Sequence, residues 1–275
     1  IPAATAEENY RAALAALDEA KKLGITSVQD ITFDDALEVF NKLKSEGKLT
    51  CRIYTRMPIT EYKKLVEKNI QVGYGDDFLK MGSLKAFADG SLGSSTAWFF
   101  EKYNQDTTTY GLPMDIITDG NMEKWCTDAD KNHLQLSVHA IGDKANSYML
   151  DLYEKISKEN PKWDRRFRIE HAQHVRFQDI PRFAELGVIA SVQPYHCIDD
   201  GVWAEKRIGP ERIKYTYPFK SFLDAGVKMC FGTDWYVAPL NPLLGLYAAV
   251  TRRTLDDKNP EGWIPEQKIS IEDAI

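Results

Sequence analysis

The sequence predicts an α/β fold of the TIM-barrel type, and three observations predict it. Short apolar runs alternate with helical segments along the whole chain, and such alternation favours parallel strands joined by right-handed crossovers. No Gly-x-Gly-x-x-Gly follows a strand, which argues against an open dinucleotide-binding sheet. Polar side chains close several strands rather than one, as expected for a barrel, whose chemistry lies at the carboxyl ends of its strands.

The first half of the chain sets up this alternation. Apolar residues at helical spacing predict helices over residues 5–23, 34–43 and 60–72. Runs rich in β-forming residues predict strands over residues 25–28, 49–55 and 81–87. A long connection follows, from about 88 to 118, and connections beyond about 15 residues in a compact domain are more often functional than idle. We therefore expect an active-site loop there.

The second half continues the pattern. Helices are expected over residues 121–132, 144–159, 177–186 and 217–225, and from Leu243 onward behind Asn241 and Pro242. Strands are expected over residues 134–138, 167–170 and 188–192, and in the run before Asp234. Seven strands make a barrel with one strand missing, so we expect a single barrel domain over residues 1–275.

The two ends of the chain predict a piece of a longer protein. The chain begins at Ile1 without Met, and Ser270 begins a helix that the terminus at Ile275 cuts short. We therefore expect truncation at both ends.

Composition limits the partners. The net charge is −6 and neither sign forms a block, which argues against nucleic acid or an anionic membrane and favours a small-molecule substrate. No apolar run approaches the ~18 residues of a membrane span. Four cysteines form no Cys-x-x-Cys pair, so a reducing compartment, the cytoplasm, is expected.

Four polar residues at strand ends carry the expected chemistry. His139, His171 and Asp234 offer the imidazole and carboxylate ligands that suit a divalent metal such as zinc. Lys85 lies in another predicted strand, where a neutral amine can form a carbamate that acts as a carboxylate ligand. The alternatives are that each is an ordinary polar residue at a strand end and that Lys85 pairs with Asp89 or another acid.

Three further residues are candidates for substrate contact. Trp235 directly follows Asp234, and His196 lies beyond the strand over 188–192. His174 lies three residues after His171, but the spacing is not the His-Glu-x-x-His of metalloproteases. A loop histidine without a ligand remains the alternative for His196, and a supporting or surface role the alternative for His174.

Four motifs in order resemble the amidohydrolase superfamily, and in particular the amidohydrolase 3 group, the YtcJ-like branch that includes N-substituted formamide deformylase. The matching segments are 84–94, 138–143, 168–173 and 232–242. The resemblance implies a barrel hydrolase with one or two divalent ions, zinc for preference. It implies that His139 and His171 bind one ion, that a carboxylated Lys85 bridges to a second, and that Asp234 is ligand and general base. The implied reaction is hydrolysis of a non-peptide carbon–nitrogen bond, of the amide or formamide type.

One departure keeps other functions open. The family begins with a strand ending in His-x-His, and this sequence contains none; that first strand and the flanking β-sandwich are also missing. The alternatives are a related esterase or lactonase, and a non-catalytic barrel without metal. Apolar surface left where the first strand would pack predicts a homo-oligomer.

Overall fold

The computed structural model describes residues 4–275, which divide into two compact units. Of the described residues, the first unit comprises 4–86 and 125–137, and the second comprises 87–124 and 138–275. Within the described residues, seven strands follow one another in the sheet in chain order. The pairs β1–β2, β2–β3, β5–β6 and β6–β7 are all parallel. This confirms the predicted α/β fold of the TIM-barrel type, with seven strands in the part of the chain that the structure describes.

The strands are β1 (Ser27–Ile31), β2 (Arg52–Pro58), β3 (Leu79–Phe87), β4 (Gln135–Ala140), β5 (Arg168–His171), β6 (Ile189–Val192) and β7 (Met229–Phe231). The α-helices are α1 (Ala6–Lys22), α2 (Asp34–Ser45), α3 (Tyr62–Glu67), α4 (Asp115–Thr118), α5 (Asn121–Lys131), α6 (Asp143–Glu159), α7 (Ile180–Leu186), α8 (Pro194–Asp200), α9 (Ala204–Arg212), α10 (Phe219–Asp224), α11 (Pro242–Thr251) and α12 (Ile271–Ala274). Three short 3₁₀ helices are η1 (Ile59–Glu61), η2 (Ile213–Tyr215) and η3 (Pro265–Gln267). In residues 4–275 no helix is both long and apolar enough to cross a membrane.

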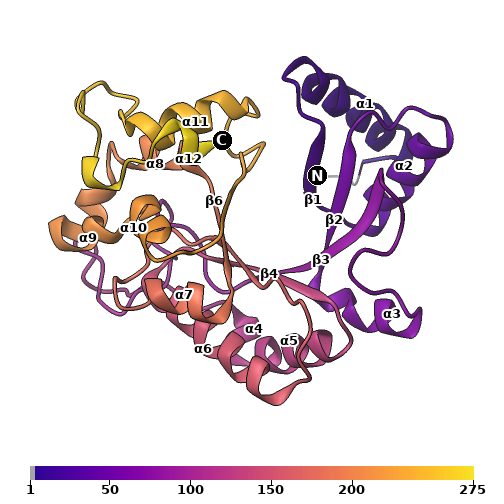
Figure 1. Ribbon diagram of the computed structural model, residues 1–275, viewed down its shortest axis with the longest axis horizontal. Coiled ribbons are helices and arrows are strands. Elements are labelled where there is room, and N and C mark those ends of the chain that lie inside the picture. Colours follow the sequence, from indigo (N-terminus) through magenta and orange to yellow (C-terminus); the bar gives the residue numbers. More distant parts are fainter. Residues whose placement is uncertain (1–3) are drawn as a thin grey trace. The chain divides into compact units, whose positions relative to one another are not determined.

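The first unit is built on one apolar cluster. Helices α1 and α2 lie side by side next to β1 and β2 (Figure 1). A capping box at Thr5 and Glu8 starts α1, because the two side chains satisfy backbone N–H groups that the first turn leaves without partners. The cluster joins both helices to the strands through Leu17, Val39, Leu43, Leu49, Cys51, Ile53 and Leu79.

Several predicted boundaries in this unit are wrong. The first strand begins at Ser27 rather than Ile25, because the Ile25 amide donates back to the Ala20 carbonyl at 2.9 Å and extends the end of α1. The second begins at Arg52, where its pairing with Ser27 begins. The helix predicted over 60–72 ends at Glu67, and Asn69 then takes a left-handed φ of 52°, a conformation that favours Asn at helix ends.

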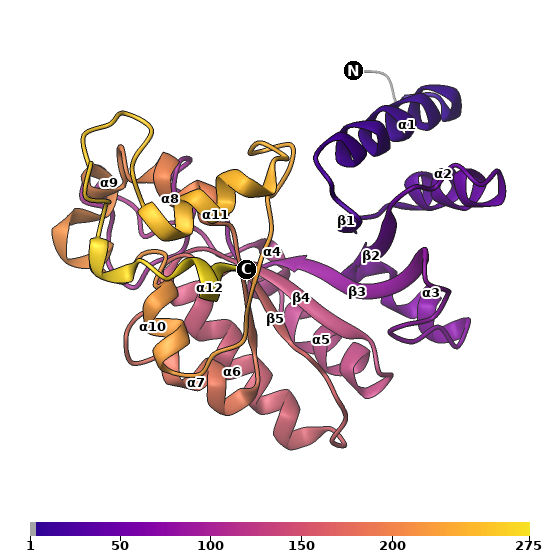
Figure 2. The ribbon, with the colours of Figure 1, turned by 45° about the horizontal axis from the view of Figure 1, so that its top comes forward.

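The second unit contains the long connection and most of the helices. Residues 88–114 form neither helix nor strand, and α4 begins only at Asp115. Helices α6 and α7 lie side by side (Figure 2). Stacking of Tyr153 on Phe167, with centroids 4.2 Å apart, joins α6 to the start of β5. The sequence did not predict α8 and α9: α8 has only seven residues, and Gly209 and Pro210 interrupt α9.

Candidate metal centre

Three strands of the second unit bring histidine and carboxylate side chains to their carboxyl ends. His171 is the last residue of β5, and Asp234 follows β7 by three residues. Both have a left-handed backbone, with φ of 74° and 57°, which breaks the side-chain alternation of the strands that precede them. Such conformations cost about 1 kcal/mol or more and cluster at functional sites.

His196 completes a group of possible ligands. Its helix, α8, begins with Pro194 directly after β6. The ligand atoms of His171, His196 and Asp234 all lie within 4.8 Å of one another, and His196 Nε2 lies 3.2 Å from Asp234 Oδ2. Two imidazole nitrogens and a carboxylate oxygen are a donor set that fits zinc and similar divalent ions. The residues present therefore fit a metal.

His139 lies beside this group. It is the fifth residue of β4, and its ring centroid is 4.5 Å from that of His171. Its Nε2 lies 3.0 Å from the Gly90 carbonyl oxygen. A carbonyl oxygen only accepts hydrogen bonds, so Nε2 carries the proton and donates. In the neutral ring Nδ1 is then the nitrogen with a lone pair, the form that binds metals.

Asp89 is a site residue that the sequence suggested only as a partner for Lys85. Its carboxylate is buried and accepts hydrogen bonds from the backbone amides of Trp98, Ile141 and Gly142. Its Oδ1 also lies 3.5 Å from His139 Nε2. Its position two residues after β3 is the signal that could have identified it, by the same strand-end rule that selected the histidines.

His174 lies in the protein interior rather than at the site surface. It is 0% exposed, its Nε2 accepts from Gln173 Nε2 at 3.1 Å, and its Nδ1 donates to Thr216 Oγ1 at 2.8 Å. Burial, with a smaller contribution from Arg212, lowers the pKa of His174 to about 3. A fully buried ring cannot touch a substrate, so the predicted substrate contact is replaced by a structural role.

Asp200 supports the helix that carries His196. It lies one turn further along α8 and accepts hydrogen bonds from the Tyr217 hydroxyl at 2.6 Å and from Gln173 Nε2 at 2.7 Å. Burial raises the pKa of Asp200 to about 6. The two hydrogen bonds fix the end of α8, and through it the place of His196.

The remaining predicted residues are Trp235 and Lys85. Trp235 is 49% exposed, and the chain turns back just after it, since the Val237 amide donates to the Asp234 carbonyl at 2.8 Å. Trp235 is thus accessible next to Asp234. Lys85 belongs to the first unit, where it is a buried residue of β3. Its part in a metal centre stays a prediction.

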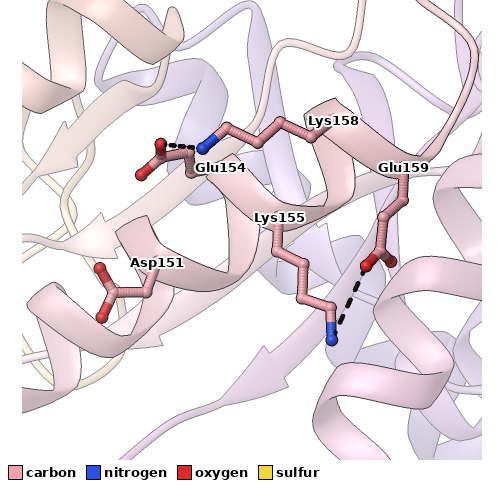
Figure 3. Close-up of a pocket in the computed structure, with 5 residues that line it drawn as sticks. All are labelled: Asp151, Glu154, Lys155, Lys158 and Glu159. Carbon is pink, nitrogen blue, oxygen red and sulfur yellow. Dashed lines mark hydrogen bonds and ion pairs between the residues drawn. The ribbon is translucent and has the colours of Figure 1, made fainter.

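A concavity on α6 has a charged lining and contains none of the predicted site residues. Five charged side chains line it (Figure 3), with Lys158 paired to Glu154 and Lys155 to Glu159. Each pair joins residues one helical turn apart, as is common on solvated helix faces. We assign it no function.

The fold and these side chains define a class of protein: α/β barrels with histidine and carboxylate side chains at the carboxyl ends of their strands. The chain belongs to the amidohydrolase family, whose model matches residues 1–275. This confirms the resemblance seen in its motifs.

Individual relatives agree with the family. The chain is 39% identical over 251 residues to protein LONG AFTER FAR-RED 3 of Arabidopsis thaliana, covering 90% of this chain and 42% of that protein. It is 23% identical over 201 residues to N-substituted formamide deformylase of Arthrobacter pascens, covering 72% and 35%. A crystal structure of a metal-dependent hydrolase from Pyrococcus horikoshii superposes with a TM-score of 0.88 at 31% identity, covering 98% of this chain and 54% of that one. The chain thus spans less than half the length of these two curated relatives.

Proposed function

We propose that this chain forms the larger part of the active site of a metal-dependent hydrolase that cleaves non-peptide carbon–nitrogen bonds, of the amide or formamide type. The observation that carries the proposal is the group of His171, His196 and Asp234 at the ends of neighbouring strands. Membership of the amidohydrolase family supports hydrolysis. The name of the deformylase relative supports the choice of a carbon–nitrogen bond. A cytoplasmic location remains part of the proposal.

We assign the ion, zinc for preference, to His171, Asp234 and His139, with His139 using Nδ1. His196 Nε2 then donates to Asp234 Oδ2 across 3.2 Å and orients that carboxylate, as partners of metal ligands commonly do. Three protein ligands, two imidazoles and one carboxylate, would be the ligand set of catalytic rather than structural zinc. The rival assignment uses His196 in place of His139.

A divalent ion held by these side chains would polarise the substrate carbonyl and make water a better nucleophile near neutral pH. Asp234 accepts the proton of the attacking water and returns it to the leaving nitrogen, so that the products are an acid and an amine. His196 holds the carboxylate in the orientation that both transfers need. Trp235, exposed beside Asp234, is placed to contact the substituent on the scissile bond.

The test compares variants of the full-length protein on a panel of N-substituted formamides and amides. Asp234→Asn removes the proton acceptor, and we expect kcat to fall by about 10²- to 10⁴-fold. The control is Asp224→Asn, which changes an exposed carboxylate paired with Lys220 in α10. Unchanged hydrolysis in Asp234→Asn contradicts the proposal. Faster turnover of matched esters or lactones than of every amide contradicts the bond assignment alone.

The rival ligand assignments predict different metal affinities. If His139 is the ligand, His139→Asn weakens zinc binding more than His196→Asn does. If His196 is the ligand, the order is reversed. Zinc affinity measured by competition with a chromophoric chelator decides between them.

A further inference from the structure

The Asp89 carboxylate joins three segments of the second unit. Its Oδ1 accepts from the Ile141 amide at 3.0 Å, and its Oδ2 accepts from the Gly142 and Trp98 amides, both at 2.8 Å. Ile141 follows β4, Gly142 precedes α6, and Trp98 lies in the long loop. The Asp89 side chain is 0% exposed, so all three hydrogen bonds are shielded from water.

The residues on both sides of Asp89 contact His139. The Ala88 amide donates to the His139 carbonyl at 2.8 Å, and the Gly90 carbonyl accepts from His139 Nε2 at 3.0 Å. Asp89 is therefore the centre of a short segment that holds His139 by backbone and by ring. Its own Oδ1, 3.5 Å from Nε2, adds a negative charge beside the ring N–H.

The close approach of the loop to α6 depends on Gly142. A Cβ at this residue would lie 2.1 Å from the Trp98 carbonyl oxygen, a separation that no side chain permits. The missing side chain lets the Trp98 amide reach the carboxylate that also holds Gly142. The loop, the end of β4 and the start of α6 therefore pack directly against one another around Asp89.

We propose that Asp89 is a positioning residue for His139, which it holds with Nε2–H directed at Gly90 so that Nδ1 is presented for metal. The arrangement itself stands on the hydrogen bonds above, whereas its consequence for metal binding rests on the function proposed for the site. When a carboxylate or carbonyl oxygen accepts a hydrogen bond from the ring N–H of a metal-binding histidine, it fixes the tautomer and the orientation of the ring.

The hydrogen bonds around Asp89 need both its negative charge and oxygens that only accept hydrogen bonds. Three amide donors converge on its two oxygens, and an asparagine would place an NH₂ group against at least one of them. The positive end of the α6 dipole lies at Gly142 and favours an anion there. Asp89→Asn therefore changes hydrogen bonding with almost no change in side-chain volume.

The first measurement needs no metal. With ¹⁵N-labelled histidine, the ring signals of the metal-free chain at pH 8 are assigned with His139→Asn. In the wild-type chain we expect a single His139 tautomer with a slowly exchanging Nε2 proton. In Asp89→Asn we expect that proton to exchange at least tenfold faster, or the two tautomers to mix.

Asp143→Asn is the matched control. Asp143 is also buried near the start of α6, and its two oxygens accept from the Phe100 amide at 2.9 Å and the Tyr215 hydroxyl at 3.2 Å. It joins a loop to α6 as Asp89 does, but neither of these two hydrogen bonds involves a histidine ring. We expect it to lower thermal stability while leaving the His139 signals as in wild type. His139 signals unchanged in Asp89→Asn, or changed equally in both variants, overturn the proposal.

The second measurement is the affinity for Co²⁺, followed by its visible absorption. We expect Asp89→Asn to weaken binding by roughly 10- to 100-fold, the usual effect of removing such a partner, and Asp143→Asn to weaken it much less. Equal weakening in both variants overturns the positioning role at the metal. If the wild-type protein binds no Co²⁺, the proposed function fails, and the exchange of the His139 proton still decides whether Asp89 positions the ring.

Discussion

His174 predicts how the stability of the second unit depends on pH. Its folded-state pKa of about 3 lies below the ordinary value of 6.5, so between these values the unfolded chain binds a proton that the folded chain does not. Stability from this group is complete above pH 6.5 and is lost as the pH falls toward 3. At about 1.4 kcal/mol per pKa unit, the loss is on the order of 5 kcal/mol.

The test is His174→Asn, whose amide still donates toward Thr216 but does not titrate. We expect this variant to be less stable than wild type at pH 7 and to lose stability less steeply between pH 6.5 and 4, by urea denaturation. Replacing the exposed His133 by Asn controls for the loss of an imidazole. A variant curve parallel to the wild-type curve over this range would show that His174 is not the group responsible.

At the scale of elements, a buried arginine holds the segment after α11. Arg252 is 0% exposed and donates to three carbonyl oxygens, those of Trp263 at 2.7 Å, Tyr217 at 2.9 Å and Thr216 at 3.3 Å. It thus ties residues 252–263 to the stretch that leads into α10. A side chain with five donors and no acceptor suits such a set of carbonyls.

Arg252→Met keeps much of the packing but leaves these carbonyls without their donor. We expect a loss of roughly 3 to 5 kcal/mol of unfolding free energy and faster tryptic cleavage at sites between 253 and 268. Arg253→Met is the control, because that neighbouring arginine is exposed. Equal stability and equal cleavage in the two variants would contradict a clamping role.

The helices differ in how well the sequence predicts them. Helices α1 and α6 were predicted nearly to the residue, because long amphipathic periods dominate local alternatives. The segment of α8 and α9 was missed, because a helix of seven residues contains too few turns to show a period. This omission mattered for the site, since the start of α8 is what places His196 next to Asp234.

The site was predictable only in part, for a related reason. His171 and Asp234 were selected by one rule, that parallel strands end at the same edge of a sheet, and the structure groups them. The contacts of Asp89 depend on a 27-residue irregular segment folding back onto β4 and α6. An irregular segment of this kind leaves no periodic pattern in the sequence, so its contacts could not be predicted. His174 shows the converse, since a histidine near a motif can belong wholly to the interior.

For the whole molecule, the prediction concerns the number of bound ions, because the ligands that the resemblance implies lie in two compact units. His139, His171 and Asp234 belong to the second unit and Lys85 to the first. The second unit alone offers a group of nitrogen and oxygen donors sufficient for one ion.

We expect one equivalent of zinc by elemental analysis of the chain purified without chelators, retained in Lys85→Ala and lost in His171→Ala. Zinc at 100 times its Kd should then stabilise the wild type and Lys85→Ala alike, by about 2.7 kcal/mol. A second equivalent that Lys85→Ala removes would contradict the one-ion prediction and identify a carboxylated Lys85 as a bridging ligand, since an uncharged methyl group cannot hold an ion.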